Sequence, residues 1–223
     1  MSGTGTEIPR QITRLIEVTE QTVEVYDAIK DIRGLPEAFQ EVRKWLPLVE
    51  QTLREAKLPA KKVKSTDDAN MLETRLDNCE TKADNLLEIF QKIARKSTEE
   101  FDPFVYRSIA VKLGKHRAET LMGGILEDLL AFVTHQMFQE AMQNRVGPLD
   151  KARQELANVS PSLSESDLDE QPGTAIQNGD GNRQFNNFGP GTQKNVDGNY
   201  FEAKGDQHLG TVPSKKSRGR KDT

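Results

Sequence analysis

The strongest constraint on the fold is a set of apolar residues that recurs at alternating steps of four and three between residues 72 and 93. The residues are Leu72, Leu76, Cys79, Ala83, Leu86, Phe90 and Ile93. These steps place every member on one side of an α-helix, so the pattern predicts a long helix that packs against other helices along one seam. Thr66 or Asp67 is expected to cap its start, and Arg95 and Lys96 suit its negatively polarised end.

Apolar stripes on both sides of this segment predict a helical bundle over residues 8–157. The first stripe contains Ile12, Leu15, Ile16, Thr19, Val23, Tyr26 and Ile29, and the second contains Phe39, Val42, Leu46, Val49 and Leu53. We expect the first helix to end at Gly34 and the second to begin at Pro36, because proline suits the first turn of a helix. Pro47 is expected to kink or break the second helix, and residues 58–65 to form a basic loop.

The rest of the bundle is expected to contain one short helix and one very apolar helix. Asp102 followed by Pro103 is typical of a helix start, and Phe104, Val105, Ile109 and Leu113 are expected to form a short helix. The segment 121–138 is apolar on more than one face, which predicts a central helix. Gly147 and Pro148 are expected to end it, with a short polar helix from Leu149 to Val159 after them.

These patterns predict an all-α fold with four to five helices over residues 1–159. The side chains expected to form the helix-packing core are Leu15, Ile16, Val23, Tyr26, Phe39, Val42, Leu46, Leu76, Cys79, Leu86, Phe90, Leu126, Leu129 and Val133. Residues 160–173 are acidic and flanked by prolines, which predicts a flexible linker and a domain boundary. Residues 174–212 form a further segment of different composition, and residues 213–223 a basic tail.

The segment 174–212 contains a repeat. Asp180-Gly181-Asn182 recurs as Asp197-Gly198-Asn199 at an offset of seventeen residues. Its composition is too polar and glycine-rich to bury a core, so intrinsic disorder is expected for the free monomer. The alternative is that the two copies stack as layers of short strands, with asparagine ladders at roughly 4.8 Å and edges that recruit further molecules. The residues of this amyloid-competent motif are Asn178, Asp180, Gly181, Asn182, Phe185, Asn186, Asn187, Phe188, Gly189, Asn195, Asp197, Gly198, Asn199, Tyr200 and Phe201.

Composition excludes several classes of protein. The 31 basic and 35 acidic residues are nearly balanced, so a nucleic-acid partner is not expected. The single cysteine excludes an internal disulfide, and the sequence contains neither a secretory signal nor an apolar run of about 18 residues, so we expect a cytoplasmic protein. The basic cluster between Lys215 and Lys221 is expected to be a solubilising tail, with a nuclear address or a contact to anionic membranes as alternatives.

Motifs for catalysis are absent, so we expect no enzymatic activity, no cofactor and no metal site. The sequence contains neither a G-x-S-x-G nor a G-x-x-x-x-G-K-[ST] pattern. The histidines His116, His135 and His208 are scattered, Cys79 is expected to be a small core residue, and His135 a surface or boundary residue. Glu127 and Asp128 are adjacent on a helix, so we interpret them as solvated carboxylates that face different directions.

Three segments carry a resemblance to known families. Residues 26–53 and 78–93 resemble the SesA-type, or HeLo-like, helical domain of fungal death-pathway proteins, which is otherwise found at the N-termini of NACHT and other STAND P-loop NTPases. Residues 179–201 resemble the short prion-forming sigma motif, also called SesB. The combination is similar to the arrangement of the HET-s group of cell-death effectors.

The resemblance implies a mechanism and a set of partners. A NACHT or STAND receptor with a matching motif templates the C-terminal motif into an amyloid oligomer, and the clustered helical domains then act at membranes. The expected partners are therefore further copies of this chain, the receptor and membrane lipids, with recruitment to the plasma membrane on activation. Related effectors often begin with a strongly apolar helix, whereas residues 6–30 are amphipathic. A non-lytic signalling adaptor that binds receptor helical domains therefore stays open as an alternative, as does a nuclear role.

The repeat makes a specific prediction about assembly. Replacing Gly181 and Gly198 by proline is expected to block templated assembly, because proline cannot donate to a strand ladder. The helical content of residues 8–157 is expected to stay unchanged in circular dichroism. Seeded fibre growth of the double variant at the wild-type rate would show that the layered arrangement is wrong.

Overall fold

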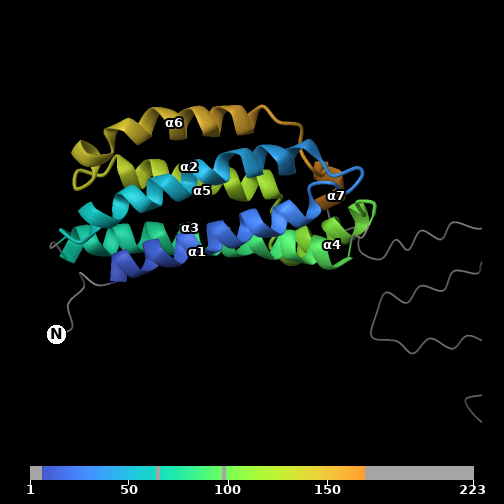
Figure 1. Ribbon diagram of the computed structural model, residues 1–223, viewed down its shortest axis with the longest axis horizontal. Helices are drawn as coiled ribbons and strands as arrows, with labels where there is room; N and C mark the ends of the chain where they lie inside the picture. The colour runs from blue at the N-terminus through green and yellow to red at the C-terminus, as the bar shows by residue number, and fades with distance from the viewer. Residues whose placement is uncertain (1–6, 64–65, 97–98, 169–223) are drawn as a thin grey trace, which may run out of the picture. The chain divides into compact units, whose positions relative to one another are not determined.

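A computed structural model describes residues 7–63, 66–96 and 99–168, and within these ranges every regular element is an α-helix (Figure 1). The helices are α1 (Glu7–Ile29), α2 (Glu37–Ala60), α3 (Thr66–Lys96), α4 (Pro103–Lys112), α5 (Ala118–Val133), α6 (Gln139–Ala157) and α7 (Glu165–Leu168). The predicted all-α bundle is confirmed for this part of the chain. The residues of the predicted amyloid motif lie outside the described ranges.

The five long helices lie in layers (Figure 1). α1 and α3 lie side by side, α2 and α5 lie next to them, and α6 covers the opposite side of α2 and α5. α4 packs against α3 and α7 at one end of the bundle. α5 contacts α2, α3 and α6, which agrees with the prediction that the most apolar segment is central.

The predicted seam of α3 is buried along its whole length. Its seven members, which the sequence pattern singled out, have exposed fractions between 0% and 5%. Near the end of this seam, the ring of Phe90 stacks on Phe39 at a centroid distance of 5.3 Å and lies 6.0 Å from Tyr26. Phe39 also meets Tyr106 edge-on at 5.2 Å, so one aromatic cluster joins α1, α2, α3 and α4.

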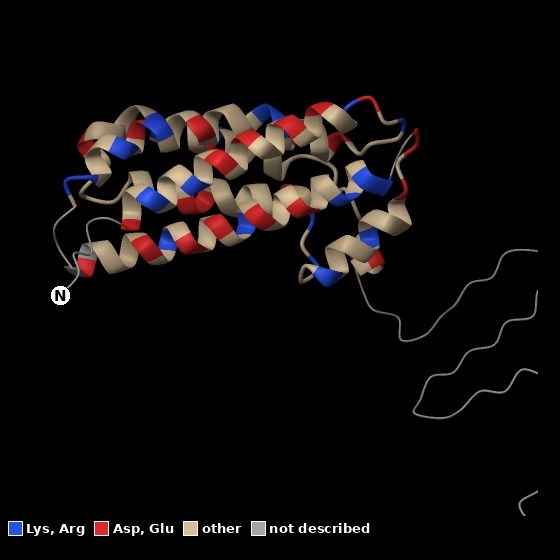
Figure 2. Cartoon of the chain, turned by 60° about the horizontal axis from the view of Figure 1, so that its bottom comes forward, with Lys and Arg blue, Asp and Glu red and all other residues tan. Residues whose placement is uncertain are grey.

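Charged residues of both signs are interspersed on the outer faces of the long helices (Figure 2). Arg14 on α1 lies 3.6 Å from Glu80 and 3.5 Å from Asp84, both on α3. Exposed pairs of this kind contribute at most about 1 kcal/mol each, so the burial of the apolar seam dominates the stability of the α1–α3 contact.

The start of α4 is confirmed as predicted. The Asp102 carboxylate accepts hydrogen bonds from the backbone N–H groups of Phe104 at 2.8 Å and Val105 at 3.2 Å, and Pro103 occupies the first turn. The side chain of Phe104 is 79% exposed, and Tyr106 is the buried aromatic residue of this helix. The N-cap and the proline orient the first turn so that Phe104 lies on the outer side.

Several predicted helix ends are wrong. α1 ends at Ile29 rather than at Gly34, and Gly34 instead has a positive φ of 81° in the following loop. α2 continues without a break through Pro47 and on to Ala60, so the predicted loop over 58–65 begins after Ala60. The neighbouring Leu46 and Val49 are buried, and their packing outweighs the backbone hydrogen bond that Pro47 cannot make.

The predicted break at Gly147 and Pro148 is also wrong. The chain turns earlier, between α5 and α6, where the ring of Phe138 packs on Phe132 at a centroid distance of 4.2 Å. α6 then runs through Gly147 and Pro148 to Ala157, with Leu149 fully buried. The two rings thus pack against each other across this turn.

The aromatic cluster predicts a large difference between two matched substitutions. Phe90→Ala should lower the free energy of unfolding by about 3–5 kcal/mol, because it leaves a cavity between four helices. Phe104→Ala should change it by less than about 0.5 kcal/mol, because that side chain is exposed. Urea unfolding followed by circular dichroism measures both, and equal losses would contradict the packing described here.

Candidate functional site

The residues predicted as core occupy the bundle interior. All of them are buried except Val23, which is partly buried against the core. The residues of the predicted amyloid motif, 178–201, lie outside the described part of the chain. The candidate site is therefore built from surface features of the bundle, and the most developed one lies where the described chain ends.

Residues 160–168, which we call the C-terminal strap, are docked on the bundle. The sequence predicted a solvated linker from residue 160, but Leu163 and Leu168 are buried, with exposed fractions of 6% and 5%. The backbone carbonyl of Asp167 accepts a hydrogen bond from Arg107 Nε at 2.5 Å, and Glu165 pairs with Arg117. The first part of the predicted linker is thus a packed element, and a domain boundary beyond residue 168 stays a prediction.

A chain of hydrogen bonds fixes the strap to α4 and α5. The N–H of Ala118 donates to the Tyr106 hydroxyl at 3.0 Å, and Tyr106 lies 2.8 Å from Ser162 Oγ. Ser162 donates to Glu119 through both its hydroxyl, at 2.6 Å, and its N–H, at 3.0 Å. Since the Ser162 proton points to the Glu119 carboxylate, the Tyr106 proton points to Ser162 Oγ, and every member has a partner. Burial raises the pKa of Tyr106, so the phenol stays protonated.

A groove with a volume of about 690 Å³ lies beside this junction, between α3, α5 and the end of α6. Its walls include Asn78, Lys82 and Asn85 from α3, Glu119, Gly123, Gly124 and Glu127 from α5, and Arg153 and Leu156 from α6. The α3 residues follow helical spacing and share one face of that helix. The mixture of amide, cationic and carboxylate groups suits a polar partner, such as a charged helix or peptide.

Gly124 and Asp128 determine how Lys82 lies in this groove. A Cβ atom at position 124 would come within 2.8 Å of the Lys82 side chain, so the missing side chain lets Lys82 lie against α5. Lys82 then pairs with Asp128, one turn further along the helix, and Arg75 lies 3.7 Å from the same carboxylate. The prediction of a solvated Asp128 is therefore wrong, because its side chain is only 7% exposed and is neutralised by two cations. Glu127 is exposed, so the two carboxylates do face different directions.

Cys79 and the histidines offer no catalytic or metal-binding arrangement within the described ranges. Cys79 is buried, and burial followed by the nearby Asp128 charge raises the pKa of its thiol, which keeps it protonated. His135 lies in the turn after α5 and its Nδ1 accepts from the N–H of Met137 at 3.3 Å. Over residues 7–63, 66–96 and 99–168, the structure brings together no group of three His, Cys, Asp or Glu side chains that could bind a metal ion.

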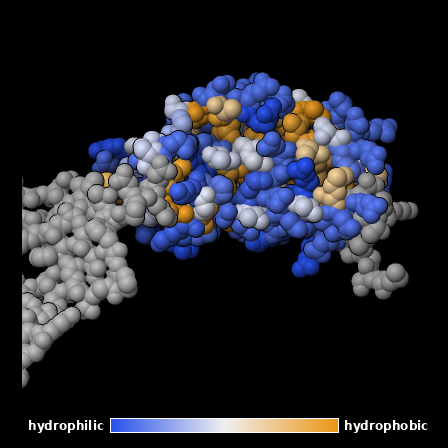
Figure 3. All heavy atoms as spheres, turned by 180° about the vertical axis from the view of Figure 1, so that it is seen from behind, coloured by the Kyte–Doolittle hydropathy of each residue, from blue (hydrophilic) through white to orange (hydrophobic). Residues whose placement is uncertain are grey.

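The outer surface of the bundle is mainly polar. Hydrophobic residues form small separate patches among hydrophilic ones on the face shown in Figure 3. Among the described helices, none is sufficiently long and apolar to cross a membrane.

Sequence reasoning missed most of this site. Tyr106, Glu119 and Ser162 come from three separate segments, so no local spacing connects them. One signal was available: Gly123 and Gly124 interrupt an otherwise leucine-rich helix, and such a pair often indicates a close approach of another group.

The comparisons with known proteins bear on the bundle. Residues 12–131 match the family model SesA, described as the N-terminal domain on NACHT NTPases and P-loop NTPases. The match begins in α1 and ends within α5, so α6 and the strap lie beyond it. No curated protein and no solved structure matches the chain.

The hydrogen-bond chain predicts that removing the Tyr106 hydroxyl group destabilises the bundle. Tyr106→Phe should lower the free energy of unfolding by about 1–3 kcal/mol, because it leaves the buried Ala118 N–H without an acceptor. Tyr26→Phe is the matched control, since the Tyr26 hydroxyl makes no hydrogen bond to any residue that the structure describes. Urea unfolding measures both, and an equal response of the two variants would contradict the assigned network.

Proposed function

The chain belongs to the SesA family of N-terminal domains on NACHT NTPases and P-loop NTPases, and from this premise we propose that it is an effector of a fungal programmed-cell-death pathway. Its C-terminal motif is templated into amyloid by a cognate NACHT or STAND receptor that carries a matching motif. Templating clusters the helical domains, which then act at membranes.

One observation carries this proposal: a SesA domain stands in the same chain as a seventeen-residue Asp-Gly-Asn repeat. The domain supplies a link to NACHT proteins, and the repeat supplies a chemically plausible means of self-templating. Clustering raises the local concentration of each domain, so weak individual contacts become avid ones without any new interaction.

The C-terminal strap is placed to couple the helical bundle to the C-terminal repeat. It is the last described segment before the repeat. It is held by one hydrogen-bond chain, two buried leucines, the hydrogen bond from Arg107 to Asp167 and the ion pair between Arg117 and Glu165. Assembly of the following segment would pull on these contacts first. Their loss would uncover Tyr106 and the wall of the α3–α5–α6 groove, which gives the bundle a means to respond to assembly.

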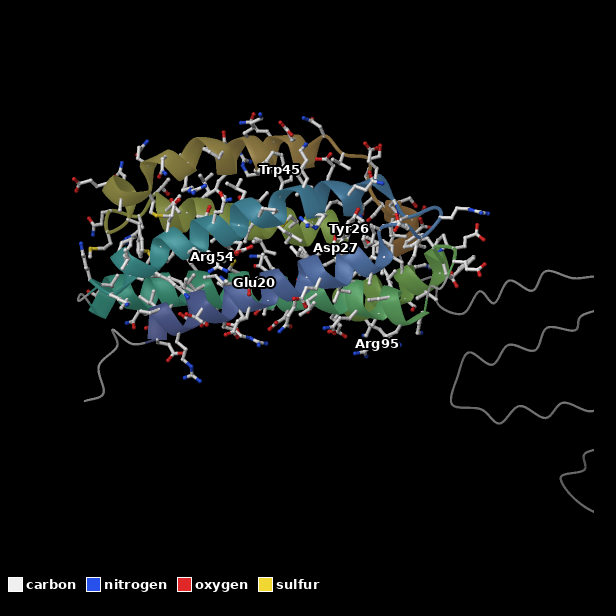
Figure 4. The ribbon with its side chains drawn as sticks, in the orientation of Figure 1. Glu20, Tyr26, Asp27, Trp45, Arg54 and Arg95 are labelled. Atoms are coloured by element: carbon white, nitrogen blue, oxygen red, sulfur yellow. The ribbon has the colours of Figure 1, made fainter. Side chains whose placement is uncertain are left out.

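The groove supports a second candidate function. A non-lytic adaptor would bind the helical domain of a receptor through a polar surface, and the α3–α5–α6 groove offers amide and charged groups on three helices. On the amphipathic α1, Glu20 lies beside Arg54 of α2 and pairs with it (Figure 4). The exposed Glu17 and Glu24 of α1 also suit contacts with another protein.

Seeded assembly distinguishes the two functions. Preformed fibres of a peptide spanning residues 174–212 should convert the full chain into thioflavin-positive fibres, and the converted protein should release dye from liposomes. Fungal cells that express the chain with an activated receptor should die. Fibres without leakage and with surviving cells would favour the adaptor, and a failure to form fibres would exclude the templating mechanism.

A matched control separates templating from aggregation. A peptide with the residues of 174–212 in scrambled order has the same composition but lacks the seventeen-residue register. It should not seed the full chain, because asparagine ladders require like residues in register. Equal seeding by both peptides would show that composition alone drives assembly.

A further inference from the structure

A small basic cleft lies at the end of the bundle where α3 meets α4. It has a volume of about 260 Å³ and is lined by Lys92, Arg95, Lys96, Ser108, Ile109 and Lys112. Four of these six residues are cationic, and none is a carboxylate. This differs from the α3–α5–α6 groove, whose lining contains both signs of charge.

Most cations of this cleft lack a counter-charge. Lys92 pairs with Glu88 on its own helix, whereas Arg95, Lys96 and Lys112 form no ion pair with any residue in the described ranges. Arg95 lies at the margin of the domain and points away from the bundle (Figure 4). A cation at a helix C-terminus stabilises that helix through its dipole, without any partner molecule. Here the ends of two helices bring three unpaired cations to one cleft, which creates a local positive field.

An exposed aromatic side chain lies on α4, one of the two helices that form the cleft. Phe104 is 79% exposed, more than the other large exposed apolar residues of the described chain, Leu58 at 71% and Met71 at 51%. Phe104, Ser108 and Lys112 follow each other at steps of four, so they lie along one face of α4, about 6 Å apart along its axis per step. An aromatic ring next to lysine and arginine is the combination that binds at the boundary between lipid headgroups and acyl chains.

We propose that this α3–α4 face docks on a bilayer that contains anionic phospholipids. Arg95, Lys96 and Lys112 contact lipid phosphates, and Phe104 enters the headgroup boundary. The inference rests on the proposed action at membranes and assigns it to a face and a lipid class. A soluble phosphate could occupy the cleft, but it would leave Phe104 without a function, so the bilayer accounts for both features.

The opposite end of the bundle provides a matched control. Lys57, Lys61 and Lys62 lie beside the exposed Leu58 at the end of α2. The surface next to them also holds Glu55, whose carboxylate pairs with Arg145. This end therefore has about as many cations as the α3–α4 cleft, but its surface carries charges of both signs. Neutralising three of its lysines changes the net charge of the protein by the same amount as the triple variant of the cleft.

The test measures binding of the full chain to vesicles by co-sedimentation. Vesicles of phosphatidylcholine with about one third phosphatidylserine should bind the protein, and vesicles of phosphatidylcholine alone should not. The triple variant Arg95→Gln, Lys96→Gln, Lys112→Gln should lose roughly fivefold in affinity for each cation, on the order of 100-fold together. Phe104→Ser should weaken binding roughly tenfold, and Phe104→Trp should restore it. All these positions are exposed, and circular dichroism checks that the fold is retained.

Three other outcomes would each contradict one element of the proposal: the face, the lipid ligand or the action at membranes. If the triple variant Lys57→Gln, Lys61→Gln, Lys62→Gln loses as much affinity as the cleft variant, the assignment to the α3–α4 face is wrong, although membrane action stands. If millimolar inorganic phosphate abolishes vesicle binding and Phe104→Ser has no effect, the cleft is a phosphate site and not a lipid-docking face. If neither free nor seeded wild-type protein binds anionic vesicles, the proposed action at membranes fails together with this inference.

Discussion

The fold depends on one requirement: α3 must bury its apolar seam along its full length. The helix has 31 residues, about 46 Å at 1.5 Å per residue, and its outer surface is too polar to pack on all sides. α1 covers one side of the seam, α5 another, and α4 packs near the end. The aromatic cluster around Phe90 then fixes α2 as well. The layers of the bundle are thus a consequence of the length and one-sidedness of a single helix.

The periodicity of apolar residues was a reliable guide to the core. Among the glycine and proline signals, Pro103 marked a helix start correctly, but others did not. The stripes on the first three helices identified core residues that the structure buries, because a helix that exposed such a stripe would lose many favourable contacts. Pro47 and the Gly147-Pro148 pair did not end their helices, because the packing of neighbours such as Leu46 and Leu149 outweighs their local cost. Gly34 lies in the loop, five residues beyond the end of α1. The turn after α5 was missed because residues 133–139 contain no glycine or proline, and Phe132 and Phe138, which pack across it, belonged to one continuous apolar segment.

The candidate site was much less predictable than the core. Tyr106, Glu119 and Ser162 carry ordinary residue types at unrelated positions, and only the tertiary structure joins them. Asp128 was interpreted as solvated because a carboxylate usually is, but Gly124 and Lys82 create a place for it inside the α3–α5 contact. The family match extends to Ala131 and concerns the bundle, so the functional proposals for the C-terminal motif depend on its repeat and its chemistry.

The buried thiol of Cys79 has a practical consequence. It is the single cysteine of the chain, it lies on the seam of α3, and it stays protonated beside Asp128. Alkylating reagents react with exposed thiolates, so they should modify this protein only when α3 separates from its neighbours. The native sequence therefore contains its own chemical reporter: the rate of thiol alkylation, measured before and after fibre assembly, indicates whether the bundle opens or stays closed while the rest of the molecule polymerises.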